Sequence, residues 1–174
     1  MKKWMGFAAT LLFVIVVGFA LACGMPPVAQ EKPAETPPSD HGLQKRTVAD
    51  MRNTGTAMFS WLTDQVGAAA AGQSQVPEPI DIAEYARISH ADLTTLLVPA
   101  YMQEVPDLDG WESPYELYVN VDNPLARKVL GIRSPGRDKA FSGNVYTVTP
   151  FEPTSFDEDL VWADGYFVRW PQRK

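Results

Sequence analysis

Apolar residues recur at steps of three and four over residues 43–66, and this spacing predicts one long amphipathic helix. The stripe consists of Val48, Met51, Gly55, Met58, Leu62 and Val66, and Phe59 widens it. Polar residues of the same segment lie mostly off the stripe, as in a surface helix that covers a core. We expect this helix to end near Gly67, where a loop rich in small and polar residues begins.

A second, shorter helix is predicted to begin at Ser89. Ser89 and Asp92 have capping-box spacing, which is typical of a helix N-terminus. The helix should end before Pro99, because the residue that precedes a proline disfavours the helical conformation.

After Pro106 the pattern changes to the alternation of apolar and polar residues that is typical of strands. The alternation is clear over residues 115–121 and weaker over residues 128–134. These two segments therefore predict two strands with one buried face each.

The last segment predicts a hairpin. Residues 160–163 and 166–170 form two short runs around Asp164-Gly165, a dipeptide favoured in two-residue turns. Together these elements indicate an α+β fold in which a long N-terminal amphipathic helix packs on a small antiparallel β-sheet.

The N-terminus has the pattern of an export signal. Two lysines follow Met1, and a short apolar run then ends in Ala-Leu-Ala before Cys23. This ending resembles the lipobox of bacterial lipoproteins, with Ala20 where the family usually has leucine. The resemblance implies that residues 1–22 are a lipoprotein signal peptide and that Cys23 carries the lipid that anchors the chain stably to a membrane.

Three other interpretations of this segment stay open. A plain secreted protein would be cut after Ala22 and would keep a free cysteine. The apolar run from Trp4 to Met25 also approaches the ~20 residues that an uncleaved transmembrane helix needs. A pilin-type signal would be cut near Gly6, although the residue five positions after that cut is Leu11 instead of an acid.

Residues 24–42 are expected to be a disordered tether. They contain five prolines and hardly any large apolar side chain, so they cannot bury enough surface to fold. The predicted organisation is therefore a signal peptide, a lipidated Cys23 with a proline-rich tether, and a globular domain over residues 43–174.

The net charge and the cysteine content limit the classes of binding partner and the cellular compartment that we expect for this protein. The chain has a formal net charge of −6, which disfavours nucleic acid and anionic lipid head groups as partners. Because the one cysteine is assigned to the anchor, no internal disulfide is expected. We therefore expect an extracytoplasmic protein that a lipid anchors to the inner or outer bacterial membrane.

Several short motifs occur in an order known from one secretion family. They occupy residues 50–53, 97–101, 106–115, 132–138 and 159–161. Their order resembles the globular domain of the major pseudopilin of type II secretion, the general secretion pathway protein G family. The resemblance covers roughly residues 44–161 and implies a helix on an antiparallel sheet with a structural role.

The same resemblance implies a calcium loop. Asp138 and Asp159 match the two family aspartates, and Asp157 offers a further oxygen donor. Lys139 stands where the family has glycine. The other interpretation is a solvated acidic loop over residues 152–159 that keeps the surface soluble.

The proline-rich tether argues against a filament, because a flexible joint cannot transmit the register that a filament requires. The sequence also lacks hydrolase, phosphate-loop and zinc-protease motifs. We therefore expect a non-catalytic pseudopilin-like lipoprotein that binds an envelope protein, linked to type II secretion or type IV pilus-like machinery, with no small-molecule substrate. The alternatives are a calcium-stabilised binding module unrelated to secretion, an envelope hydrolase built on Asp107 and Asp109, and a true filament-forming pseudopilin.

Overall fold

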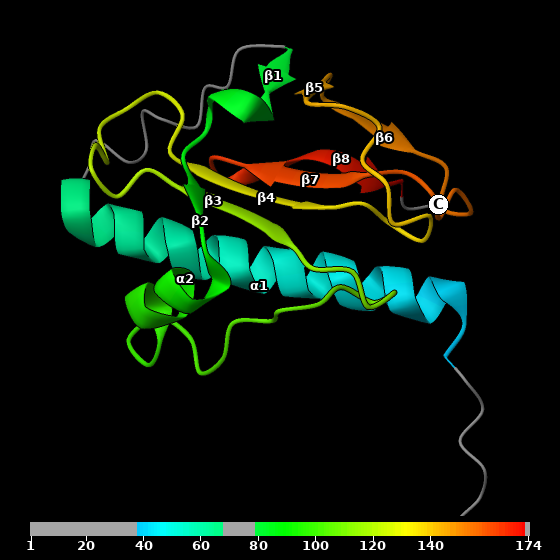
Figure 1. Ribbon diagram of the computed structural model, residues 1–174, viewed down its shortest axis with the longest axis horizontal. Coiled ribbons are helices and arrows are strands. Elements are labelled where there is room, and N and C mark those ends of the chain that lie inside the picture. The colour runs from blue at the N-terminus through cyan, green and yellow to red at the C-terminus, as the bar shows by residue number, and fades with distance from the viewer. Residues whose placement is uncertain (1–37, 68–78, 173–174) are drawn as a thin grey trace, which may run out of the picture. The chain divides into compact units, whose positions relative to one another are not determined.

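The computed structural model describes residues 38–67 and 79–172, and these residues form an α+β fold (Figure 1). Helix α1 (Asp40–Val66) lies along one face of a mainly antiparallel sheet, and the shorter helix α2 (His90–Leu97) packs beside it. The prediction of a long helix on a mainly antiparallel sheet is confirmed. The predicted signal peptide and most of the predicted tether lie outside the described residues.

Helix α1 has a defined start. Ser39 adopts an extended conformation (φ −70°, ψ 155°), and its side chain accepts a hydrogen bond from the Gly42 amide at 3.3 Å. Serine is a favoured N-cap because its oxygen satisfies one of the free amides of the first turn. The helix therefore begins at Asp40 instead of Leu43, and His41, which was expected in the tether, lies in its first turn.

The second helix begins where its capping signal predicted. The Ser89 hydroxyl accepts a hydrogen bond from the Asp92 amide at 3.1 Å and donates to the Asp92 carboxylate at 2.6 Å. The helix ends at Leu97, ahead of Pro99. Helix α2 thus follows directly from the short-range sequence signals at its two ends.

The described strands form two sheets. The larger sheet has the order β2 (Arg87–Ile88), β3 (Glu116–Val119), β4 (Leu130–Ser134), β7 (Leu160–Ala163), β8 (Tyr166–Pro171) and β6 (Thr149–Phe151). Strand β6 runs parallel to β8, and all other neighbours in this sheet are antiparallel. The smaller sheet pairs β1 (Ile80–Asp81) with β5 (Val145–Tyr146), next to the 3₁₀ helix η2 (Ile82–Glu84).

The predicted strands correspond to the central part of the larger sheet. Strands β3 and β4 lie within the two alternating segments, and β7 and β8 form the predicted hairpin around Asp164-Gly165. Strands β1, β2, β5 and β6 have two or three residues each, too few for a recognisable alternation. Long-range pairing, which the sequence does not display, creates these four strands.

The register of the sheet builds the main core under α1. Leu117 pairs with Ile132, and Ile132 pairs with Trp162, so one apolar row crosses β3, β4 and β7. This row belongs to the same cluster as Met58 and Leu62 of α1. Since each of these residues is at most 4% exposed, the stripe predicted from the sequence forms the helix side of the core.

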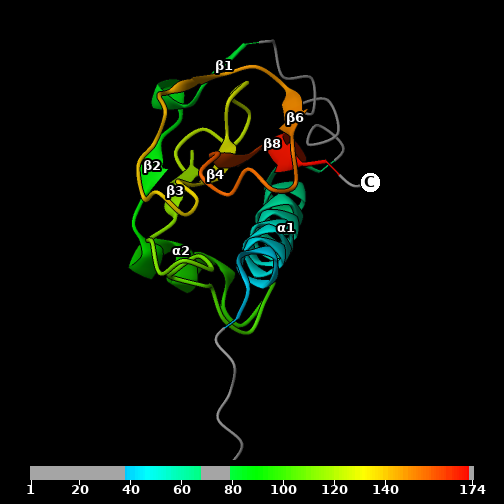
Figure 2. The same ribbon diagram turned by 90° about the vertical axis from the view of Figure 1, so that its right-hand side faces the viewer.

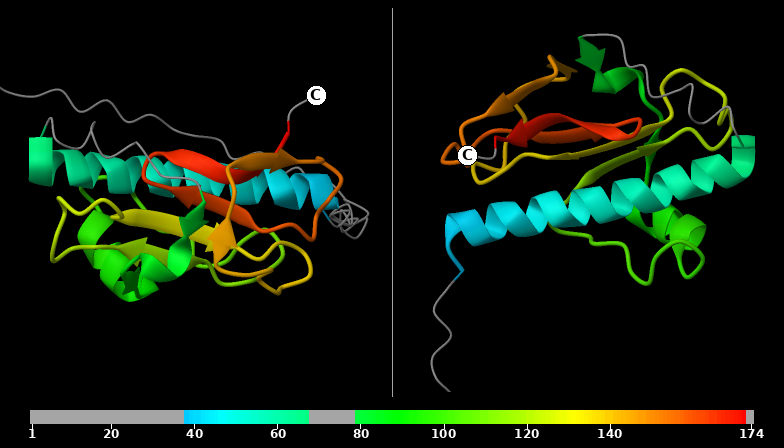
Figure 3. Two further views of the ribbon diagram at one scale, coloured as in Figure 1. Left: turned by 90° about the horizontal axis from the view of Figure 1, so that it is seen from above. Right: turned by 180° about the vertical axis from the view of Figure 1, so that it is seen from behind.

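The other face of the sheet is also covered. Tyr118, Val161 and Val168 form a second apolar cluster with Ile80 and Ile82, which belong to the β1–η2 segment. Figures 2 and 3 show the resulting layers, with α1 on one side of the sheet and β1 on the other. Because both faces are buried, strands such as β7 are apolar at every position.

Two glycines permit close contacts with α1. A Cβ at Gly55 would lie 2.6 Å from the Trp162 ring, so the indole of this β7 residue packs directly against the helix backbone at Gly55. A Cβ at Gly110 would lie 2.3 Å from the Leu43 carbonyl oxygen. The Gly110 amide donates to the Thr47 hydroxyl at 2.9 Å, which fixes this loop on the first turns of α1.

Candidate functional site

The acidic loop predicted to bind calcium forms an ion pair at Asp157. The Nε and Nη2 atoms of Arg137 donate to the two carboxylate oxygens of Asp157, each at 2.8 Å. Arg137 also pairs with Asp40, 3.2 Å away in the first turn of α1. The hydrogen bonds from Arg137 lower the pKa of Asp157 below its ordinary value. The loop is thereby tied to the start of the helix.

The other two predicted calcium ligands have separate roles. Asp138 is exposed, and its Oδ1 accepts a hydrogen bond from the Ala140 amide at 3.1 Å. Asp159 is 2% exposed, and its Oδ2 accepts from the amide and hydroxyl of Ser142 and from the Tyr146 hydroxyl. Asp159 therefore holds the segment before β5 against the sheet.

The arrangement of these carboxylates does not fit a calcium ion. Residues 38–67 and 79–172 contain no group of three or more His, Cys, Asp or Glu side chains placed to hold a metal. The guanidinium of Arg137 next to Asp157 would also oppose a bound cation. Calcium binding stays a prediction from the resemblance. Cys23, the predicted site of lipid attachment, lies outside the described residues.

A partly buried ion pair joins strands β3 and β4 of the larger sheet. Glu116 on β3 accepts hydrogen bonds from Arg133 Nε at 2.6 Å and from the Tyr118 hydroxyl at 2.7 Å, and it pairs with Arg87 at 3.1 Å. Burial raises the pKa of Glu116, but these donors and the two arginine charges outweigh it, so the net shift is downward. Glu116 is therefore held in its charged form.

The rest of the Arg133 guanidinium is also satisfied. Its Nη1 donates to the Gly143 carbonyl at 2.9 Å, to Asn144 Oδ1 at 3.1 Å and to the Tyr146 hydroxyl at 3.2 Å. The guanidinium carbon lies 3.9 Å from the centroid of the Phe141 ring. Because protein groups occupy these donors, the ion pair acts as a structural bridge and is not open to a ligand.

The two aspartates considered for a hydrolase are in different environments. Asp109 is 1% exposed, and its Oδ1 accepts hydrogen bonds from the amides of Trp111 and Ser113, both at 2.9 Å. Its Oδ2 accepts from the Ser134 hydroxyl at 2.6 Å. Asp109 is thus a turn former, whereas Asp107 is exposed and lines the cleft described next.

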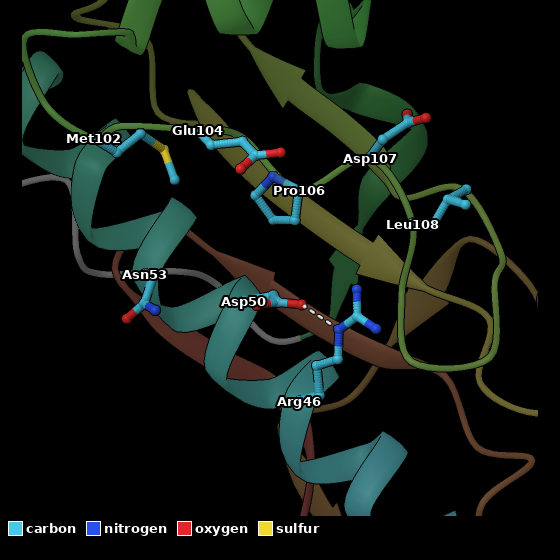
Figure 4. A pocket seen from close by; sticks show the side chains of 8 residues that line it. All are labelled: Arg46, Asp50, Asn53, Met102, Glu104, Pro106, Asp107 and Leu108. Carbon is cyan, nitrogen blue, oxygen red and sulfur yellow. Dashed lines mark ion pairs between the residues drawn. The ribbon is translucent and has the colours of Figure 1, made fainter. Parts of the chain in front are cut away.

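A cleft of about 440 Å³ lies between α1 and the segment that precedes β3 (Figure 4). Its lining consists of Arg46, Asp50, Asn53, Met102, Glu104, Pro106, Asp107 and Leu108. Arg46 Nε lies 3.6 Å from Asp50 Oδ2 across one helical turn. Burial raises the pKa of Asp50, and Arg46 opposes this shift. Acidic and basic groups are thus mixed in this cleft, and it presents no single charge to a ligand.

A larger groove of about 1240 Å³ lies between the first turns of α1 and strand β8. Strand β8 and helix α2 lie on different sides of α1 (Figure 1). The lining consists of His41, Gln44, Lys45, Val48, Ala49, Arg52, Val148, Pro153, Thr154, Tyr166, Phe167, Trp170, Pro171 and Gln172. Arg52 on the α1 wall contacts the β8 wall, since its guanidinium carbon lies 5.8 Å from the Phe167 ring centroid. Basic and aromatic side chains therefore meet in one depression.

No local pattern in the sequence predicts this groove. Lys45 and Arg52 are seven positions apart, and this spacing places them on one face of α1, which is the signal that was available. The facing wall comes from Phe167 and Trp170, far away in the sequence. Only the packing of β8 beside α1 brings the two walls together.

Comparisons with models of protein families, with curated proteins and with solved structures give no match for this chain. Within the described residues, no helix is both long enough and apolar enough to cross a membrane. The candidate site therefore stands on its own geometry, and the groove is the larger of the two depressions described above.

Proposed function

We propose that this protein is a lipid-anchored, non-catalytic binding domain of the bacterial cell envelope. In this proposal Cys23 carries the lipid, the proline-rich segment spaces the domain from the membrane, and residues 38–172 bind an envelope protein. In this proposal the partner belongs to type II secretion or pilus-like machinery, which the pseudopilin-like order of motifs favours.

The observation that carries the proposal is the cap of α1. A filament-forming pseudopilin needs one helix that continues from the membrane stem into the globular domain. Here Ser39 is extended and its side chain caps the first turn, so the helix of the domain starts at Asp40. Pro37 and Pro38 precede this cap and disfavour helix in the residues before them. This supports a tethered domain in preference to a polymerising one.

The buried polar groups support a non-catalytic role. The oxygens of Asp109 and the guanidinium of Arg133 are used for hydrogen bonds within the fold. The groove beside β8 instead presents side chains suited to contact with another protein, because aromatic and arginine residues are enriched at binding surfaces.

Labelling with an alkyne fatty acid in a bacterial host tests the anchor directly. Wild-type protein should incorporate the label and appear in the membrane fraction, whereas Cys23→Ser should lose the label. Ala20→Leu is the matched control: it brings the signal closer to the family pattern and should keep the label. An unlabelled wild-type protein that is retained in membranes would instead support an uncleaved transmembrane helix and contradict the proposal.

A further inference from the structure

We propose that the groove between α1 and β8 binds an extended, acidic polypeptide segment of a partner protein. This inference rests on the proposed function, because it assigns a ligand class to the binding role of the domain.

The charge of the groove differs from that of the whole chain. The chain contains 21 acidic residues and has a net charge of −6, yet none of the residues that line the groove is acidic. His41, Lys45 and Arg52 all lie on the α1 wall. Neither Lys45 nor Arg52 has an ion-pair partner among the described residues. These charges are therefore available to carboxylates of a ligand.

Two acidic residues near the groove, Asp40 and Glu158, are already paired. Asp40, at the start of α1, interacts with Arg137 and with the Trp111 indole. Glu158 forms an ion pair with Arg169 on β8. Because these carboxylates have partners, they do not neutralise the basic wall of the groove.

The groove also offers apolar contacts. Phe167, Trp170 and Pro171 supply the β8 wall, and such surfaces accept apolar or proline side chains of an extended peptide. A ligand that combines carboxylates with apolar or proline side chains therefore matches both walls.

The length of the groove matches a short extended segment. The α1 wall runs from His41 to Arg52, which corresponds to about 16 Å at the rise of an α-helix. About five residues of extended chain cover the same distance. A nucleic acid is a poorer ligand, because its long array of phosphates would also meet the negative charge of the rest of the domain.

Peptide binding to the full chain in nanodiscs of zwitterionic lipid tests this inference. The probe is a short fluorescent peptide of alternating glutamate, proline and tryptophan, and its control has lysine in place of glutamate. The acidic peptide should bind more tightly than the basic one, and its affinity should fall with added salt because exposed charges are screened. Equal binding of the two peptides, or no binding of either, would overturn the inference.

Charge-reversal variants locate the contact. Lys45→Glu combined with Arg52→Glu should weaken binding of the acidic peptide by roughly tenfold, as expected for two lost and reversed surface charge contacts. The matched control is Arg127→Glu, an exposed charge reversal outside the groove, which should change the affinity by less than about twofold. Unchanged affinity in the double variant would contradict the assignment.

Two further variants separate the remaining explanations. Trp170→Ala removes an apolar contact without a charge change, so it should weaken binding while the salt dependence stays the same. Deletion of residues 24–37 should leave the affinity for the acidic peptide unchanged. If the deletion raised this affinity by more than about tenfold, the chain's own N-terminal segment would be the occupant of the groove. That result would overturn the proposal of a partner segment. The fatty-acid label reports the anchor separately, so failure of peptide binding and failure of lipidation are distinguishable.

Discussion

At the residue scale, the partly buried Glu116–Arg133 pair shows how charge is used within the sheet of this domain. Arg133 has donors to Glu116, to backbone and to Tyr146, so one guanidinium connects the large sheet to the segment before β5. Removal of one partner of such a pair leaves the other charge uncompensated. The pair is therefore a sensitive test of the described packing.

Glu116→Gln should destabilise the fold by about 2 kcal/mol at pH 7, because Arg133 and Tyr118 lose a charged acceptor. The pKa of Glu116 is lowered in the folded state, so the unfolded state binds more protons as the pH falls. The stabilisation is thus present above the ordinary glutamate pKa of about 4.3 and is lost as the pH drops through the lowered folded value. Urea unfolding of both proteins at neutral and acidic pH measures this, and a stability difference that does not narrow in acid would contradict it.

Gly55→Ala should destabilise the protein by about 1–2 kcal/mol, because the added methyl group overlaps the Trp162 ring and overpacking costs more than the gain in helix propensity. Gly42→Ala is the matched control on the same helix. Its Cβ would meet only the Ser39 hydroxyl at 3.6 Å, an ordinary contact, so it should be neutral or stabilising. Thermal melts compare the two, and equal melting temperatures would argue against the close approach of α1 and β7.

At the scale of elements, local signals account for the helices and for the central strands. The apolar stripe of α1, the Ser89 cap of α2 and the Asp164-Gly165 turn each operate within a few residues, and each predicted its element. Strands β1, β2, β5 and β6 depend on partners far away in the sequence. The groove shares this dependence, because one of its walls belongs to β8.

Ser39→Ala should lower the free energy of unfolding by about 1 kcal/mol, since it removes the acceptor for the Gly42 amide at the start of α1. Thr56→Ala serves as the control. Thr56 is exposed in the middle of the helix and donates to the Arg52 carbonyl, so this change should stay within about 0.5 kcal/mol. Chemical denaturation gives both values, and an unaffected Ser39→Ala variant would argue for a helix that continues before Asp40.

At the scale of the whole molecule, both apolar clusters consist of residues between 43 and 168. One cluster lies under α1 and the other under β1 and η2, so the sheet is covered on both faces. The described residues therefore supply an apolar cluster on each face of the sheet.

Deletion of residues 24–35, with Cys23 and Ser39 kept, should therefore leave the melting temperature within about 2 °C of the wild type. Leu62→Ala provides the contrast, because Leu62 is 1% exposed and its truncation in the core should cost about 2–5 kcal/mol. Calorimetry of the deletion variant measures the effect. A loss of stability as large as that of Leu62→Ala would place the proline-rich segment within the fold.

By itself the sequence determined the two helices, the central strands and the hairpin, because periodicity, caps and turn residues act between neighbours. The tertiary structure decided which side chains meet across long separations. For example, Arg137 donates a hydrogen bond to Asp157, and Ser142 and Tyr146 donate hydrogen bonds to Asp159. The tertiary structure also formed the groove, because a wall made by α1 and a wall made by β8 exist as one surface only after the chain has folded.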